Sequence, residues 1–478
     1  MTIINTFWKQ SMIYGVGTIL VRAVSFVLLP LYTTFFSPAE VGYVYLLFTF
    51  IAFAQVFYNH GMDSAFLKFI SQDNEDKKSV LNTSILVALF TSLLLSIILY
   101  LAADSISVFY LEIYEPTWIK LCSIILFIDV LSSRIMAYLR VIERPIYFST
   151  ISIMSVAVTI ISNIYLITNL NMGILGVLYG TLAGSLIRFI MVIPLLFTGL
   201  NYKLFKFDLY KRMFIFGLPF FPAALFFMIM EMADRYLLLH LADVETVGIY
   251  SIGYKMGSVL MFLITGFNLA WQPLFHKEQN NKNRLEIFST ISTQFLVFMI
   301  LVGGIVSVWL PLIVQIPIGN GNTLIGKDFW DSIQFIPIIM LSYIFYAAYI
   351  LQMPSLYDGN NQKWSPLLRG LGAIINIGLN LVLIPKYGGM GAAISTLLAY
   401  SIMFLALFII NRKWLPISFK YGRIFMLLGI CIIGFYFLEI EPDKLWSRFI
   451  LSIVILSVGI PLLKFENKNQ FSNLFIKE

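Results

Sequence analysis

Charged residues are scarce in this chain. Of its 478 residues, 12% are charged and 59% are hydrophobic. A soluble globular domain carries about 25% charged residues, so the composition excludes an ordinary water-soluble protein. The polar breaks between apolar runs are short and leave no room for a soluble domain, which predicts an integral membrane protein.

Residues suited to metal, redox or nucleotide chemistry are also few. The two cysteines, Cys122 and Cys431, both fall in apolar runs, where a structural disulfide has no obvious role. The three histidines, His60, His240 and His276, are too scattered for a metal site. We find no phosphate-binding glycine loop, nucleophile elbow or HExxH segment. We therefore predict no catalytic residue, metal or cofactor. Because no nucleotide-binding motif is found, we expect any step that needs energy to be driven by an H+ or Na+ gradient.

Long apolar runs, in contrast, fill nearly the whole chain. A helix needs about 20 apolar residues to cross the hydrocarbon of a bilayer, and continuous runs of this kind differ from the short alternating strands of a barrel. The sequence therefore predicts an all-α polytopic membrane protein with about fourteen transmembrane helices. The predicted spans are 12–34, 41–60, 80–102, 116–139, 148–168, 174–197, 215–240, 248–273, 286–310, 332–353, 364–384, 390–411, 423–439 and 446–463.

The distribution of positive charge predicts the orientation of these spans. Most of the 32 Lys and Arg residues fall in alternate loops, as expected if those loops and both termini are cytoplasmic. The net charge of +7 is thereby explained by topology, and no nucleic-acid partner is predicted.

Two pairs of short motifs predict an internal repeat. Val41-Gly42-Tyr43-Val44-Tyr45 opens the second span and Val247-Gly248-Ile249-Tyr250 the eighth, while Gly173 and Gly388 begin matching Gly-x-x-Gly motifs at the sixth and twelfth. A repeat of six crossings returns to its starting side, so the halves would be parallel, and transporters built this way bind substrate in a cleft between them. We expect lobes at 1–200 and 201–414, followed by two additional helices and a cytoplasmic tail at 415–478. The alternative is that glycine-rich turns match by chance.

Ionisable residues within the spans are the candidate site, because a charge in hydrocarbon is costly unless it faces a wet cavity or a partner. Three cations, Arg22, Arg235 and Lys255, could together hold a phosphate, since Arg offers a bidentate fork and Lys a point charge. Candidates for cavity lining or ion coupling are Thr18, Ser25, Gln55, Asn59, Asp63, Asp129, Glu231, Asp234 and Ser258.

Simpler interpretations stay open for several of these residues. Glu231 and Arg235 are four residues apart and can pair along one helix. Arg134 and Arg188 could pair with Asp129, or with backbone carbonyls, inside one lobe. The acidic candidates are either counter-ions to the cations or carriers of protons or sodium.

Two segments carry a family resemblance: Ala233-Asp234-Arg235-Tyr236, and Val247 to Lys255 (VGIYSIGYK). With Arg22, two six-helix halves and two extra helices, they make the chain resemble bacterial polysaccharide-biosynthesis transporters. These are flippases for lipid-linked oligosaccharides, of the O-antigen or capsule type, in the multidrug/oligosaccharidyl-lipid/polysaccharide exporter superfamily.

The resemblance implies a fold and a cargo. Two helical bundles would form a V around a cationic central cavity, which carries the pyrophosphate of an undecaprenyl-linked oligosaccharide from the inner to the outer leaflet by alternating access. It also implies a place in the bacterial plasma membrane. The implied partners are membrane lipids and the glycan polymerase and glycosyltransferases of the same pathway.

Three alternatives remain. Flippases of the peptidoglycan lipid precursor look similar but have a cation on the second helix, where this chain has Gln55 and Asp63. An ion-coupled multidrug or cation antiporter of the same superfamily should have an acidic or aromatic cavity. A membrane enzyme is disfavoured, because the longest outer loop, 311–330, contributes only Lys327 and Asp328.

Overall fold

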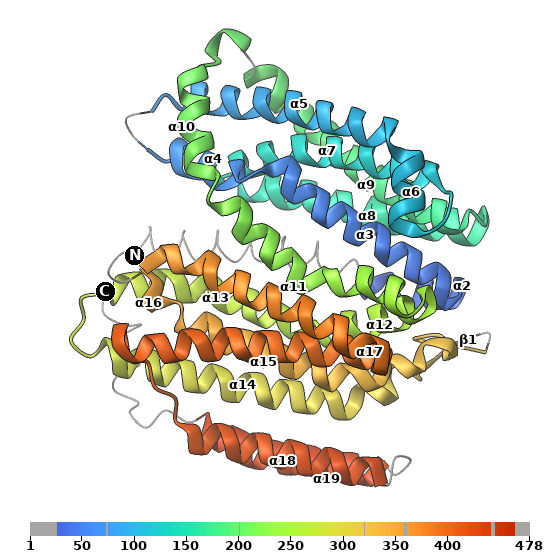
Figure 1. Ribbon diagram of the computed structural model, residues 1–478, viewed down its shortest axis with the longest axis vertical. Helices are drawn as coiled ribbons and strands as arrows, with labels where there is room; N and C mark the ends of the chain where they lie inside the picture. The colour runs from blue at the N-terminus through green and yellow to red at the C-terminus, as the bar shows by residue number, and fades with distance from the viewer. Residues whose placement is uncertain are drawn as a thin grey trace. The chain divides into compact units, whose positions relative to one another are not determined.

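The computed structural model describes residues 26–72, 75–199, 201–319, 321–357, 361–440 and 445–463. Nearly all of this part of the chain is helical (Figure 1), which confirms the predicted all-α class. Among the described residues, nine helices are long and apolar enough to cross a membrane, or up to eleven if each of two bent pairs is one span. Most of the predicted first span lies outside the described residues.

Packing divides the chain into two compact units. The first contains residues up to Ser251 together with Asn380–Gly389, and the second contains Ile252–Leu379 and the residues from Met390 onward. Residues 201–251 thus pack with the first unit, whereas the repeat assigns them to the second half. The predicted lobe boundaries concern sequence repetition rather than packing, and they stay a prediction.

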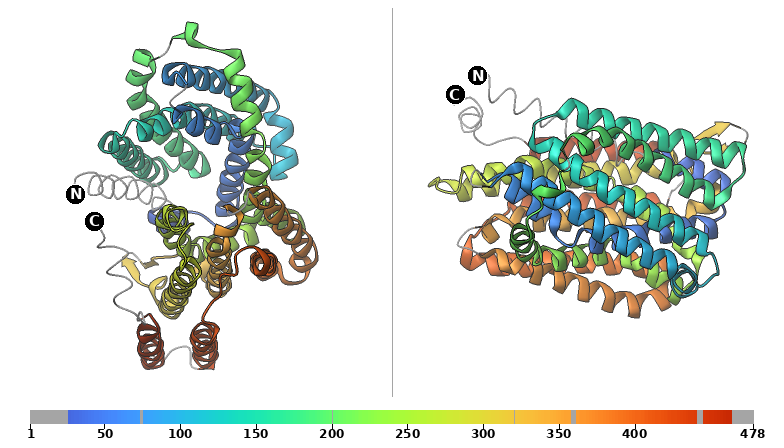
Figure 2. Two further views of the ribbon diagram at one scale, coloured as in Figure 1. Left: turned by 90° about the vertical axis from the view of Figure 1, so that its left-hand side faces the viewer. Right: turned by 90° about the horizontal axis from the view of Figure 1, so that it is seen from above.

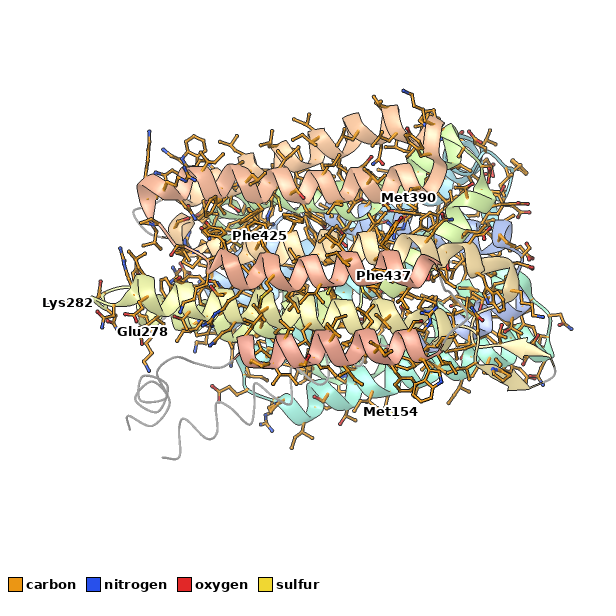
Figure 3. All side chains as sticks on the ribbon, turned by 90° about the horizontal axis from the view of Figure 1, so that it is seen from below. Met154, Glu278, Lys282, Met390, Phe425 and Phe437 are labelled. Carbon is orange, nitrogen blue, oxygen red and sulfur yellow. The ribbon has the colours of Figure 1, made fainter. Side chains whose placement is uncertain are left out.

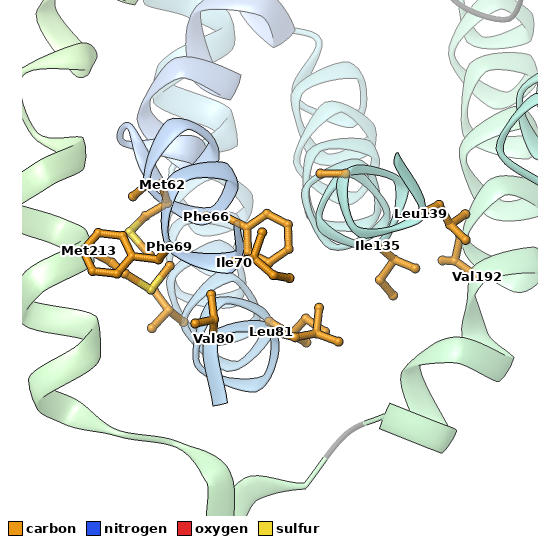
Figure 4. Packing of buried hydrophobic residues seen from close by; sticks show 14 of the residues in the cluster. Met62, Phe66, Phe69, Ile70, Val80, Leu81, Ile135, Leu139, Val192 and Met213 are labelled. Atoms are coloured by element: carbon orange, nitrogen blue, oxygen red, sulfur yellow. The ribbon is translucent and has the colours of Figure 1, made fainter. Parts of the chain in front are cut away.

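Apart from the helical segment Asn380–Gly389, the helices of the first unit are consecutive along the chain. They are α2 (Leu29–Phe35), α3 (Pro38–Asn59), α4 (Met62–Ile70), α5 (Lys77–Leu101), α6 (Ala103–Leu111), α7 (Pro116–Val141), α8 (Pro145–Ile164), α9 (Gly173–Gly199), α10 (Phe207–Gly217), α11 (Phe220–Leu241) and the first half of α12 (Val244–Gly257). Helix α7 lies at the centre, where it packs against α3, α5 and α9. One buried cluster joins α4, α5, α7 and α10 around Phe66, Phe69, Ile135 and Met213 (Figure 4).

The second unit continues with the remaining helices and a short hairpin. Its elements are α13 (Leu260–Lys277), α14 (Arg284–Ile313), β1 (Pro317–Gly319), β2 (Asn322–Thr323), α15 (Ile336–Gln352), α16 (Pro354–Tyr357), α17 (Trp364–Trp414), α18 (Tyr421–Ile440) and α19 (Leu445–Leu462). The last two helices lie side by side (Figure 2). They share a buried cluster with α14 that includes Leu301, Cys431 and Ile455. Phe425 and Phe437 of α18 are exposed on the outside (Figure 3), as side chains that face lipid should be.

The glycines of the predicted repeat have matching conformations. Gly173, where α9 begins, has φ +56°, and Gly388 has φ +52° inside the 51-residue α17. Such positive φ values favour glycine because it lacks a Cβ atom. Gly388 interrupts the helical backbone of α17, so α17 is two helices, in agreement with the spans predicted at 364–384 and 390–411.

Candidate functional site

A buried ion pair lies on α11 of the first unit, where it meets Tyr250 of α12. The guanidinium Nη1 of Arg235 donates to the carboxylate of Asp234 at 2.7 Å and to the backbone carbonyl oxygen of Glu231 at 2.6 Å. The hydroxyl of Tyr250 donates to the other oxygen of Asp234. Asp234 and Arg235 are almost fully buried. The two charges therefore neutralise each other in a place that could not hold either alone.

Local sequence explains how α12 brings Tyr250 to this pair. Only Ala242 and Asp243 separate α11 from α12, and the carboxylate of Asp243 accepts the N–H of Thr246 at 2.7 Å. This bond satisfies a free donor in the first turn of α12. Tyr250 follows one turn later and meets Asp234. Sequence reasoning missed Tyr250, although it stands in the repeat motif, because nothing in the sequence indicates which face of α12 meets α11.

The first turns of α3 and α12 touch through their glycines. A Cβ atom added to Gly42 would collide with the carbonyl oxygen of Val244, and one added to Gly248 would collide with that of Pro38. Each glycine thus faces the oxygen of the residue four positions before the other glycine. Such reciprocity is what a two-fold axis between two equivalent segments produces. The two copies of the predicted motif are therefore in direct, symmetric backbone contact in this structure.

A second ion pair joins α4 to α7. Arg134, which is buried, donates from Nη1 to the carboxylate of Asp63 and from Nη2 to the side-chain oxygen of Asn59 at 3.2 Å. The Asp63 side chain is half exposed. Between these two acceptors the chain turns through His60 and Gly61, with φ values of 34° and 79°. Asn59 and Asp63 therefore converge on one cation, and the partner of Arg134 is Asp63 rather than Asp129.

A third ion pair joins α7 to α9. Nη1 of Arg188 lies 3.4 Å from the carboxylate of Asp129, and Nη2 donates to the hydroxyl of Ser155 at 3.2 Å. Both charged side chains are partly exposed, Arg188 at 28% and Asp129 at 20%. This pair lies within one bundle and agrees with the structural interpretation of Arg188.

The other candidates are placed as follows. Thr18, Arg22 and Ser25 lie outside the described residues. Gln55 on α3 and Glu231 on α11 are half-buried in the first unit. Lys255, on the last turn of α12, and Ser258 belong to the second unit, where the Ser258 hydroxyl donates to the Lys255 carbonyl oxygen at 2.7 Å. A shared anion site formed by Arg22, Arg235 and Lys255 stays a prediction. Among the described residues, no cluster of His, Cys, Asp and Glu could hold a metal ion.

Comparison with known proteins identifies a family. The family model for polysaccharide biosynthesis proteins matches residues 7–279, which is more than half of the chain. A comparison with curated proteins found no match.

Several solved structures have a similar fold. Lipid II flippase MurJ, in its inward closed conformation, superposes with a TM-score of 0.73 at 18% identity, covering 98% of this chain and 99% of that one. A multidrug resistance MATE family transporter of the MOP superfamily, in an inward-facing conformation, superposes with a TM-score of 0.64 at 14% identity. The match covers 82% of this chain and 94% of the transporter. At these identities the similarity establishes the fold. The chain is thus a polytopic membrane protein of the polysaccharide biosynthesis family, with the fold shared by MurJ and the MATE transporters.

Proposed function

We propose that the protein is a flippase that moves an undecaprenyl-pyrophosphate-linked oligosaccharide across the bacterial plasma membrane for surface polysaccharide synthesis. The observation that carries this proposal is the family match over residues 7–279. The physical need is clear, because a sugar diphosphate cannot enter hydrocarbon without a substitute for its hydration. Cationic side chains in a cavity provide that substitute while the prenyl tail stays in lipid.

We further propose that Arg22, Arg235 and Lys255 bind the pyrophosphate. In this structure Arg235 is held by Asp234 and is buried, so it would serve the substrate in another conformation of the transport cycle. The reciprocal contact between Gly42 and Gly248 closes the first turns of α3 and α12 together, and opening this contact would give access to the pair nearby. The exchange would replace one anion on Arg235 by another.

Such an exchange also suggests how transport is coupled to an ion. If pyrophosphate takes Arg235, the Asp234 carboxylate loses its counter-charge inside the bundle. A buried carboxylate that has lost its counter-charge favours uptake of a proton or of a cation. Uptake of H+ or Na+ by Asp234 would then follow substrate binding and need no nucleotide.

The test is transport by purified protein reconstituted in vesicles. The substrates are a fluorescent undecaprenyl-pyrophosphate oligosaccharide, the peptidoglycan lipid precursor and an organic cation. We expect the first to flip and expect Arg22→Ala, Arg235→Ala and Lys255→Ala each to abolish flipping while leaving insertion intact. A matched control, Lys282→Ala in an exposed loop, should flip normally.

The peptidoglycan lipid precursor is the second candidate cargo, because the fold is similar to that of MurJ over nearly the whole chain. The vesicle assay separates the two, since both cargoes carry a prenyl pyrophosphate but different glycans. Flipping of the organic cation alone would contradict both proposals. Normal flipping by all three cation variants would remove these residues from the mechanism.

A further inference from the structure

Helix α10 is too short to cross a membrane and does not run with its neighbours. It has 11 residues, from Phe207 to Gly217, about half of the number that a span requires. Figure 1 shows it lying across the ends of α4 and α5, and the chain bends by 45° between α10 and α11. Helix α11 has 22 residues, enough by length alone to cross the hydrocarbon, so α10 is not needed for the crossing and lies at the end of the bundle.

One face of α10 is fastened to the first unit. Leu209, Met213 and Gly217 follow one another at intervals of four residues and are all buried, and Met213 lies beside Phe69 of α4 (Figure 4). Arg212 forms an ion pair of 2.5 Å with Glu75, just before α5. Lys68 of α4 lies 3.7 Å from the centre of the Phe216 ring. These contacts hold α10 rigidly on α4 and α5.

The opposite face of α10 is exposed but apolar. Phe207, Ile215 and Leu218 lie within about 80° of one another around the helix axis, and 65%, 61% and 48% of their surfaces are exposed. The preceding segment adds Tyr202, which is 71% exposed, and Phe205. In water this surface would be unfavourable, so it faces a medium that is at least partly apolar.

Lysines accompany these apolar side chains. Lys211 lies on the same exposed face of α10, between Phe207 and Ile215, while Lys203 and Lys206 alternate with Tyr202 and Phe205; all three lysines are exposed. The segment 201–217 contains four basic residues and one acidic residue, Asp208. Lysine side chains can extend from an apolar surface to reach phosphate groups at the membrane surface.

We propose that residues 202–218, which we name the α10 foot, bind anionic phospholipids of the leaflet at this end of the bundle. The exposed aromatic and aliphatic side chains enter the boundary between headgroups and acyl chains, and Lys203, Lys206 and Lys211 contact the lipid phosphates. Alternation of basic and large apolar side chains is characteristic of helices that lie in the membrane interface. Anionic lipid supplies the negative charge that the foot lacks.

A fluorescent probe on the foot tests this proposal. Ile215→Cys is labelled with nitrobenzoxadiazole, and the wild-type protein serves as the labelling blank because Cys122 and Cys431 are buried. The labelled protein is reconstituted in phosphatidylcholine vesicles that contain either brominated phosphatidylglycerol or brominated phosphatidylcholine, whose acyl chains quench the probe on contact. The ratio of the two quenching curves gives the association constant of the anionic lipid relative to the neutral one.

We expect the anionic lipid to be preferred several-fold at low salt, with the preference falling as salt is added. Each of Lys203→Gln, Lys206→Gln and Lys211→Gln should lower the preference by up to roughly fivefold, and the triple variant should abolish it. The matched control carries Lys277→Gln, Lys282→Gln and Lys413→Gln, three exposed lysines outside the foot, and should keep the preference.

Three results would overturn the proposal. Absence of quenching by either lipid would place the foot in water. Equal quenching by both lipids would mean immersion without recognition of charge. Displacement of phosphatidylglycerol by millimolar inorganic phosphate at constant ionic strength would indicate a site for a soluble phosphate compound instead of a lipid surface.

Discussion

The carboxylate of Asp234 accepts hydrogen bonds from the side chains of Arg235 and Tyr250. Substitution of Asp234 and substitution of Tyr250 should therefore lower the free energy of unfolding by different amounts. Asp234→Asn removes the buried carboxylate charge that the Arg235 guanidinium contacts at 2.7 Å, which should lower the free energy of unfolding by about 3–5 kcal/mol. Tyr250→Phe removes one hydrogen bond and should cost about 1–2 kcal/mol. Unfolding by SDS in mixed micelles measures both values.

The control for this comparison is an aspartate in an exposed ion pair. Asp104 is 60% exposed and lies 4.0 Å from Lys120, and exposed pairs contribute about 0–1 kcal/mol. Asp104→Asn should therefore leave the free energy of unfolding nearly unchanged. If Asp234→Asn changed the free energy of unfolding as little as Asp104→Asn, the buried ion pair would not contribute to stability, and this prediction would be wrong.

Asp76 should make the free energy of unfolding depend on pH in the acid range. Its carboxylate accepts the Ser79 hydroxyl at 2.6 Å and the N–H groups of Lys78 and Ser79, which begins α5. These bonds lower the pKa of Asp76 below its ordinary value of 3.8, and the Ser79 hydroxyl has the largest effect. Because the folded pKa is the lower one, the stabilisation is complete above about pH 4 and is lost as the pH falls through the folded pKa.

Two substitutions at this cap separate charge from hydrogen bonding. Asp76→Ala should lower the free energy of unfolding by about 1 kcal/mol at pH 7. Asp76→Asn should keep most of that stability but lose the acid dependence, since an amide does not titrate. Unfolding at pH 7 and at pH 3 measures both effects, and an unchanged acid dependence in Asp76→Asn would contradict this assignment.

At the scale of helices, the contact between α3 and α12 depends on two glycines. Gly42→Ala or Gly248→Ala would force a Cβ atom into a backbone carbonyl oxygen, and a backbone group cannot rotate away as a side chain can. We expect the first turns of α3 and α12 to separate and their amides to exchange hydrogen faster. Hydrogen exchange of Pro38–Tyr43 and Val244–Tyr250, followed by mass spectrometry, measures this.

Gly378→Ala is the matched control. A Cβ atom at this helical position would meet nothing within 4 Å, so the substitution should be neutral or stabilise α17 by up to about 1 kcal/mol. Unchanged exchange in all three variants would show that the glycine contact does not hold these turns together.

At the scale of the whole molecule, the last two helices are joined to α14 rather than loosely appended. Gly304 and Gly459 allow close packing, since an added Cβ atom would lie 2.8 Å from Cys431 Sγ and 2.6 Å from Leu301 Cδ1, respectively. Arg448 donates to the Val308 carbonyl oxygen at 2.5 Å, and the Trp309 indole donates to Ser452 at 2.9 Å. In lipid, packing and hydrogen bonds of this kind hold helices together.

Widening this interface should therefore detach the helix pair. Gly304→Leu should lower the thermal midpoint of the purified protein and expose the Arg423–Leu445 region to protease. Gly429→Leu, on a part of α18 where an added Cβ atom meets nothing within 4 Å, should change neither measurement. Equal behaviour of the two variants would mean that α18 and α19 do not depend on this contact.

Much of the fold was accessible from the apolar runs. Because lipid offers no hydrogen-bond partner, a run of about 20 apolar residues must satisfy its own backbone and becomes a helix. Most of the predicted spans do so, whereas those at 215–240 and 248–273 are each broken by a bend. The break at Gly388, between the spans predicted at 364–384 and 390–411, was also predicted correctly, because glycine adopts positive φ values easily. The sequence allowed Arg188 to pair either with Asp129 or with backbone carbonyls, and in the structure it pairs with Asp129.

The sequence by itself therefore determined where most of the long apolar helices lie and that buried charges need partners, because these depend on local hydrogen bonding and on the cost of charge in lipid. The tertiary structure decided which partners they have. Arg134 meets Asp63 from 71 residues away, Tyr250 meets Asp234, and the first turns of α3 and α12 meet through glycine. The apolar outer face of α10 could likewise be identified only from the structure, which shows that the opposite face is packed against α4 and α5. Such pairings depend on which helices are neighbours and on how each is rotated about its axis, and a uniformly apolar run does not specify either.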